Sequence, residues 1–130
     1  MDNVKLLNGA TLAFVGDAVY GLLVREKISQ TSRPLGELHR LSVEYVNANS
    51  QAKAFEHIKD MLSDEEMTAF KHGRNLHTHN TPKNSSVAAY HTATGLEALF
   101  GFLYLSSNKE RINELFGVIW QNHNIDKGIE

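Results

Sequence analysis

The sequence predicts a single all-α domain, and three observations lead to this prediction. The chain has 130 residues, a length that suits one compact domain with its own hydrophobic core. Its apolar residues recur mainly at three- and four-residue steps, the period of a helix packed against a core. No segment of the sequence alternates apolar and polar residues strongly enough to favour a strand over a helix. We therefore expect residues 1–130 to form one helical bundle.

The first predicted helix is strongly apolar. Leucine and valine recur along it at helical steps, and further apolar residues occupy its other faces. Such a composition predicts a helix that is buried on nearly all sides. The residues that establish the period are Leu12, Val15, Val19, Leu22 and Leu23.

Two further helices are predicted before residue 61. Pro34 suits the first turn of the second helix, because its fixed φ fits a helix and its missing amide is not needed there. That helix runs on through Leu38, Leu41 and Tyr45. The helical pattern continues from residue 47 to residue 61, and we expect a bend near residues 47–50.

A capping box predicts the start of a fourth helix. Ser63 is followed three residues later by Glu66, so each side chain can accept a bond from the other's backbone amide. Gly73 is expected to end this helix. From residue 73 to residue 84 Gly, Asn, Thr, His and Pro replace the apolar period, which predicts a long loop. Long loops in small domains often carry function.

Two helices are predicted to complete the domain. Asn84 or Ser85 can cap the fifth helix, which contains the apolar run from residue 96 to residue 103. Ser107 and Glu110 form a second capping box. This box is expected to open a last helix through Leu115, Ile119 and Trp120.

The composition excludes several classes of protein. The chain has no cysteine, which rules out a disulfide framework, a thiolate metal site and a cysteine nucleophile. No apolar run reaches the roughly 18 to 20 residues that span a bilayer, and the N-terminus lacks the pattern of a secretory signal. We therefore expect a cytoplasmic protein without a membrane segment.

Positive charge is concentrated in one part of the chain. The formal net charge is −2, yet no acidic residue occurs between Glu66 and Glu97. This gap creates a local positive field that could attract nucleic acid, although a solvated surface loop explains it about as well. His77 and His79 lack a further ligand at the spacing of a zinc site. The donors suited to phosphate and ribose oxygens are Lys71, His72, Arg74, Asn75, Lys83 and Asn84.

Asp17 and Glu97 are each the only acid within a strongly apolar helical segment. Removing water from an ionised carboxylate costs several kcal/mol unless a protein cation, a raised pKa or a metal ion compensates. One such acid is more often hydrogen-bonded or ion-paired than catalytic. Two acids make that reading less favoured if their helices touch, so the composition permits a metal site. Two carboxylates without thiolates suit Mg²⁺, which can polarise a phosphoryl oxygen and lower the pKa of a water.

Two segments carry a resemblance to a known family. Residues 12–20 (LAFVGDAVY) resemble the signature helix of the ribonuclease III catalytic domain, and residues 95–101 (GLEALFG) resemble its second acidic helix. The turns at residues 71–75 and 82–84 are similar to the Mini-ribonuclease III branch, which is bacterial and has no separate double-stranded-RNA-binding domain. The resemblance extends from about residue 6 to residue 120.

The resemblance implies a helical homodimer in which each subunit cuts one strand of double-stranded RNA, leaving 5′-phosphate and 3′-hydroxyl ends. It also implies that the biological substrate is precursor ribosomal RNA of the large subunit (23S). Asp17 and Glu97 correspond to the catalytic metal ligands, with Mg²⁺ as the cofactor. We expect phosphate contacts from Lys71, Arg74 and Lys83 and ribose contacts from Asn75 and Asn84.

The sequence departs from full-length ribonuclease III at two acidic positions. Ala13 stands four residues before Asp17, and Thr94 stands three residues before Glu97, where the family has acids. Fewer protein ligands leave more of the metal shell to water, and the number of ions per site stays open. One alternative is a non-catalytic protein of the same fold that binds structured RNA during ribosome assembly. Another is a helical interaction module whose two acids are only ion-paired.

Overall fold

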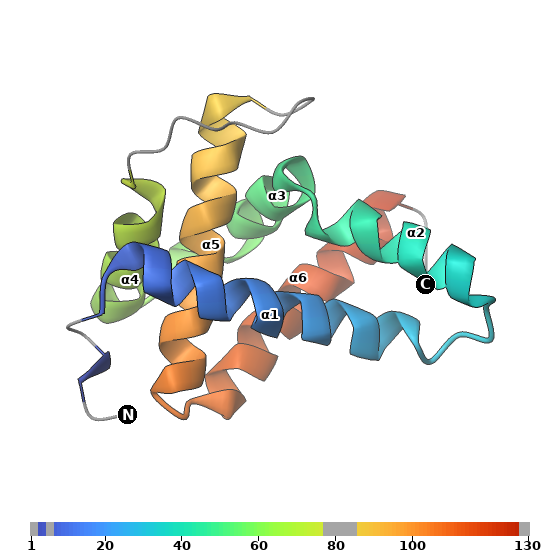
Figure 1. Ribbon diagram of the computed structural model, residues 1–130, viewed down its shortest axis with the longest axis horizontal. Helices are drawn as coiled ribbons and strands as arrows, with labels where there is room; N and C mark the ends of the chain where they lie inside the picture. The colour runs from blue at the N-terminus through green and yellow to red at the C-terminus, as the bar shows by residue number, and fades with distance from the viewer. Residues whose placement is uncertain (1–2, 5–6, 77–85, 128–130) are drawn as a thin grey trace.

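The computed structural model describes residues 3–4, 7–76 and 86–127, the last four of them by their backbone alone. This part of the chain contains α-helices, one short 3-10 helix and no strand (Figure 1), which confirms the all-α prediction. None of these helices combines the length and hydropathy of a membrane span. The elements are α1 (Gly9–Ile28), α2 (Leu35–Val46), α3 (Ala48–Ile58), η2 (Lys59–Met61), α4 (Asp64–Arg74), α5 (Val87–Leu105) and α6 (Lys109–Lys127).

Helix α5 lies at the centre of the fold and packs against α1, α3, α4 and α6. Figure 1 shows α1 crossing it, with α4 and α3 beside its first half. Leu96, Ala98, Leu99 and Phe100 have no exposed surface, so α5 is covered by other elements on most sides at this level. Glu97 therefore projects from the most buried turn of the molecule.

Helices α1 and α5 touch backbone to backbone at two glycines. A Cβ added to Gly16 would lie 1.6 Å from the carbonyl oxygen of Glu97. A Cβ added to Gly101 would lie 1.9 Å from the carbonyl oxygen of Leu12. Because real Cβ atoms do not approach other atoms closer than about 3.0 Å, only glycine permits this crossing. The crossing places Asp17, the residue after Gly16, directly beside α5.

The prediction that α1 is buried on nearly all sides is wrong. One face of α1 is in the core, where Leu12 is 2% and Val24 0% exposed. The opposite face is in solvent, where Phe14 is 81% and Leu22 67% exposed. The helical period of the sequence shows which positions of α1 are apolar. It does not show which of those positions the rest of the chain covers.

The predicted breaks between the first helices are close to the observed ones. Asn47 ends α2 and caps α3 through its side chain, which accepts from the amide of Ser50 at 2.9 Å. The expected bend near residues 47–50 is therefore confirmed. Pro34 is the residue before α2 rather than a member of its first turn.

The capping box at the start of α4 is confirmed. The amide of Glu66 donates to the Ser63 hydroxyl at 3.2 Å, and the amide of Ser63 donates to the Glu66 carboxylate at 2.8 Å. The helix continues one residue beyond the expected end, to Arg74. Gly73 instead permits close packing, because a Cβ there would lie 2.6 Å from the Cβ of Ala98. The rest of the predicted loop, residues 77–85, lies outside the described residues.

The predicted caps of the last two helices are each displaced. Ser86 caps α5, because its hydroxyl accepts from the amide of Ala89 at 3.0 Å. The second capping box is wrong, because α6 begins at Lys109 and the Asn108 side chain accepts from the amide of Arg111 at 3.2 Å. Ser107 has a φ of 59°, a left-handed conformation of the turn before the helix.

Glu66 also joins α4 to α6 through a bidentate ion pair. Arg111 donates to it from Nε at 2.8 Å and from Nη2 at 2.9 Å. Burial opposes ionisation of Glu66, but its hydrogen bonds from Arg111 and from the Ser63 amide outweigh burial and lower its pKa. Arg111 additionally donates to the carbonyl of Met61 at 2.7 Å. This pair fixes the start of α4 against the first turn of α6.

Candidate active site

The fold brings the two predicted acids together. Asp17 projects from α1 and Glu97 from α5, and their carboxyl groups share a hydrogen bond. Asp17 is exposed, whereas Glu97 is only partly exposed. The expectation of two buried acids is therefore wrong for Asp17, which lies at the rim where solvent and a substrate can reach it. Residues far apart in the sequence meet because of the glycine crossing of α1 and α5.

The electrostatics of the pair reflect its burial and its like charges. Burial, and after it the charge of Asp17, raises the pKa of Glu97 to about 8. At neutral pH the metal-free Glu97 therefore tends to keep its proton, because two adjacent carboxylates do not readily both ionise without a cation. A bound cation would take the place of that proton.

Gln51 is a third member of this site, and the sequence analysis missed it. Its side chain is 3% exposed, and its Nε2 donates to Oε2 of Glu97 at 3.5 Å. The signal was present, since Gln51 belongs to the buried stripe of α3 with Ala54, Phe55 and Ile58. A polar residue inside an otherwise apolar stripe indicates a buried hydrogen bond.

Tyr20 is a buried residue of α1 close to the carboxylate pair. It follows Asp17 by three residues on α1, is 1% exposed, and packs its ring 5.3 Å from Phe100 and 5.6 Å from Phe116. Burial first, and then the charge of Glu97, raises the pKa of Tyr20. The phenol therefore stays neutral at physiological pH.

The donors of this site fit a hard divalent cation that keeps most of its water. No group of three or more His, Cys, Asp or Glu side chains that could hold a metal occurs in the described part of the chain. Ala13 is buried, and the Thr94 hydroxyl already donates to the carbonyl of Tyr90 at 3.0 Å. The two carboxylates would therefore have to supply the protein ligands of any such ion, and Mg²⁺ is commonly held by one or two carboxylates.

The predicted RNA-binding residues are described only in part. Lys71, Arg74 and Asn75 are exposed at the end of α4. The Arg74 guanidinium lies 5.6 Å from the Phe70 ring centroid, and its Nε donates to the Asn75 side chain at 3.1 Å. Gly73, between them, packs against α5 at Thr94 and Ala98, within one turn of Glu97. Lys83 and Asn84, with His77 and His79, lie outside the described residues.

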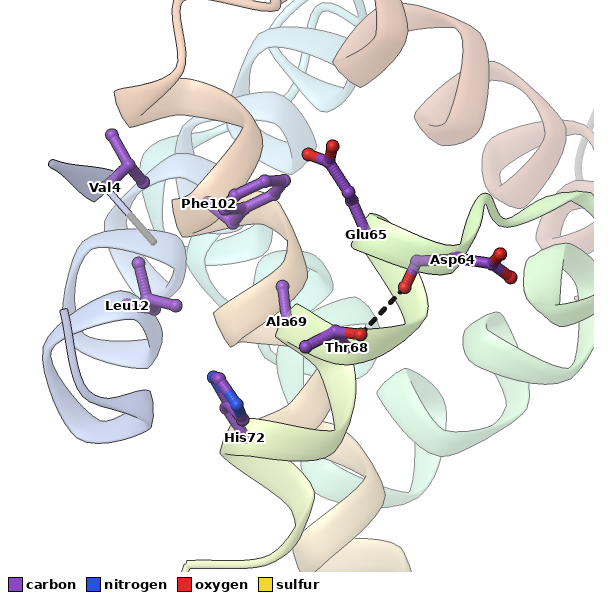
Figure 2. Close-up of a pocket in the computed structure, with 8 residues that line it drawn as sticks. All are labelled: Val4, Leu12, Asp64, Glu65, Thr68, Ala69, His72 and Phe102. Atoms are coloured by element: carbon purple, nitrogen blue, oxygen red, sulfur yellow. Dashed lines mark hydrogen bonds between the residues drawn. The ribbon is translucent and has the colours of Figure 1, made fainter. Parts of the chain in front are cut away.

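A well-formed cavity lies elsewhere, between α1, α4 and α5. Its volume is about 270 Å³, and Figure 2 shows its lining residues, with the Thr68 hydroxyl donating to the carbonyl of Asp64 at 2.9 Å. Neither Asp17 nor Glu97 lines it. The lining residues are Val4, Leu12, Asp64, Glu65, Thr68, Ala69, His72 and Phe102. The carboxylate pair thus does not belong to this cavity.

Comparison with known proteins gives a consistent result. The model of the ribonuclease III domain family matches residues 10–108. The chain is 44% identical to the Mini-ribonuclease 3 of Thermoanaerobacter sp. (strain X514), over 88% of this chain and 81% of that protein. It is 41% identical to the Mini-ribonuclease 3 of Enterococcus faecalis, over 88% and 89%. A crystal structure of a Fusobacterium nucleatum protein superposes with a TM-score of 0.84 at 28% identity, covering 93% and 98%.

These matches include both acidic helices and the crossing that joins them. The family model spans most of the chain, and the relatives are matched over most of their own length. The resemblance seen in the sequence is therefore confirmed. The chain belongs to the ribonuclease III family and is an endoribonuclease.

Proposed function

We propose that this chain hydrolyses phosphodiester bonds of double-stranded RNA with Mg²⁺ held by Asp17 and Glu97. The observation that carries the proposal is the carboxyl pair itself. Two acids from different helices share a hydrogen bond, and the pKa of Glu97 is raised to about 8. Such a pair is poised to exchange its proton for a cation, because a cation removes the repulsion between the carboxylates.

The chain's own groups have distinct parts in the proposed reaction. A bound magnesium ion would supply polarisation of a phosphoryl oxygen and a water of lowered pKa. Asp17, at the exposed rim, and Glu97, on the inner side, would hold that ion beside the reacting phosphate. Water adds to phosphorus and gives up a proton, the bond from phosphorus to the 3′ oxygen breaks, and the leaving oxygen takes up a proton from the solvent. The products carry 5′-phosphate and 3′-hydroxyl ends.

The end of α4 is the proposed contact for the RNA backbone. Lys71 and Arg74 are exposed there and would bind phosphates, while Asn75 would bind a ribose hydroxyl. Lys83 and Asn84 are proposed for the same two roles from the sequence alone. Contacts of this kind bind duplex RNA by its shape and 2′-hydroxyls rather than by base sequence.

The exposed face of α1 supports a homodimer. Phe14 is 81% and Leu22 67% exposed, Ala18 lies exposed between them, and a Cβ at Gly21 would meet nothing within 4 Å. Large apolar side chains gathered on one helix face are typical of a protein interface. We propose that a second copy of the chain covers this face.

The biological substrate proposed is precursor ribosomal RNA of the large subunit, in the cytoplasm. This proposal rests on the resemblance to the Mini-ribonuclease III branch, to which the names of the relatives also point. It does not depend on the contacts of any one residue.

Cleavage of a labelled RNA duplex tests the proposed function. Wild type is expected to cut only with magnesium, and Asp17→Asn to leave the duplex intact. Asp60→Asn, at an exposed acid of η2, serves as a control for the loss of one negative charge and is expected to cut normally. Normal cutting by Asp17→Asn would contradict the metal site. Intact RNA in every lane, with protein bound to it, would favour the non-catalytic RNA-binding alternative that Ala13 and Thr94 leave open.

A further inference from the structure

Gln51 is a buried amide that reaches the carboxylate pair from a third helix. It is 3% exposed, and its side chain makes a single hydrogen bond within the described part of the chain, to Oε2 of Glu97 at 3.5 Å. Burying a primary amide without hydrogen bonds costs free energy, so an apolar residue would pack here at lower cost. Packing of α3 against α5 therefore does not by itself explain why an amide occupies this position.

The partners of Glu97 define that role. Within the described residues its carboxyl group bonds to two side chains, Asp17 and Gln51. Asp17 is itself a ligand in the proposed site, so it cannot also anchor Glu97 from outside the metal. Gln51 is then the side chain still available to hold Glu97 in one orientation. Without it the carboxylate is free to rotate about its terminal bond.

We propose that Gln51 is a positioning residue of the metal site: its amide holds one oxygen of Glu97, so that the carboxylate is aligned with Asp17 for the ion. This inference rests on the proposed function, because it assumes that the pair binds a metal. A neutral amide suits the position, since a carboxylate there would add a third negative charge, and an apolar side chain would leave Glu97 unanchored. Partners that orient a metal ligand are typically important for metal affinity.

Binding of manganese without RNA is the primary test. The probe is Mn²⁺, followed by the electron paramagnetic resonance of the free ion. Gln51→Met keeps the length of the side chain and removes the amide, and we expect about 10- to 100-fold weaker binding than for wild type. Ser42→Ala is the matched control, because Ser42 is another buried polar residue, 4% exposed. We expect it to bind manganese as wild type does.

Cleavage at rising magnesium concentration separates positioning from a merely structural role. Gln51→Met is expected to need correspondingly more magnesium for half-maximal cutting and to regain the wild-type kcat at saturation. Unchanged manganese affinity in a folded Gln51→Met protein would overturn the inference while leaving the proposed function intact. Failure of wild type to bind manganese would instead contradict the proposed function.

Gln51→Asn keeps the test decisive if the methionine variant does not fold. It retains an amide but is one methylene shorter, and the existing bond is already 3.5 Å long. At 3.5 Å the wild-type bond is at the long end of the range, so an amide one methylene shorter cannot reach Glu97. We expect the same loss of metal affinity, and wild-type affinity in this variant would overturn the inference.

Discussion

Replacement of Gly16 by alanine tests how the site is assembled. The new Cβ would lie 1.6 Å from the carbonyl oxygen of Glu97, 2.5 Å from its carbonyl carbon and 2.9 Å from the amide nitrogen of Gly101. All three atoms are backbone, so no side chain can rotate away. Reaching even 3.0 Å from the nearest one requires a displacement of about 1.4 Å between α1 and α5.

That displacement has two expected consequences. Overpacking of a core typically costs 1–3 kcal/mol, and we expect about 3 kcal/mol here because the contacts are backbone atoms. The same shift separates Asp17 from Glu97, and a misplacement of about 1 Å can cost roughly 100-fold in rate. Gly16→Ala should therefore lose both stability in chemical denaturation and activity on duplex RNA.

A glycine in open space provides the control. A Cβ at Gly117, in the middle of α6, would meet nothing within 4 Å. Gly117→Ala should raise the free energy of unfolding by about 0.5–1 kcal/mol and leave cleavage unchanged. If Gly16→Ala unfolds at the wild-type denaturant concentration and cuts at the wild-type rate, the close crossing of α1 and α5 is not what assembles the site.

Three further predictions concern charge and assembly. A carboxyl whose folded pKa is raised loses stability as pH rises from its unfolded value toward the folded one, here about 8. Metal-free Glu97→Gln should thus melt higher than wild type at pH 8 and above, and an equal or lower Tm would contradict the raised pKa. Arg111→Met should cost about 3 kcal/mol at pH 7, because it leaves Glu66 buried without its partner. Because the folded pKa of Glu66 is lowered from its ordinary value of 4.5, that penalty should shrink as the pH falls below this ordinary value. Urea titrations that show no pH dependence would refute it. Phe14→Ser should shift sedimentation from dimer to monomer, whereas Tyr104→Ser, at an exposed residue of α5, should not; a dimeric Phe14 variant would exclude the α1 face as the interface.

The parts of the fold that local chemistry determines were predictable from the sequence. The capping box of Ser63 and Glu66 is closed by residues three apart, and the structure contains it. Ser107 offered the same pattern, but the left-handed turn there leaves Asn108 to cap α6. Neighbouring polar residues compete for a cap, and the geometry of the preceding turn decides between them.

Whether a site residue could be predicted depended on how unusual its type is in its own stretch of sequence. Asp17 and Glu97 stand out because a lone acid in an apolar helix needs compensation. Gln51 is marked only by its place in the apolar stripe of α3, and its partner Glu97 is 46 residues away in the sequence. Its role follows only from the packing of α3 against α5. The exposure of Phe14 was equally hidden, since a residue covered by a partner and one covered by the core look alike in sequence.

The most direct test of the central proposal is to locate the metal. Crystals grown with manganese, a substitute for magnesium, would show the ion by its anomalous scattering. We predict one or more peaks within coordination distance of the carboxylate oxygens of Asp17 and Glu97, and none there in Asp17→Asn. A protein that cuts duplex RNA with manganese, yet shows its peak at other residues or no peak between these two carboxylates, would contradict the account.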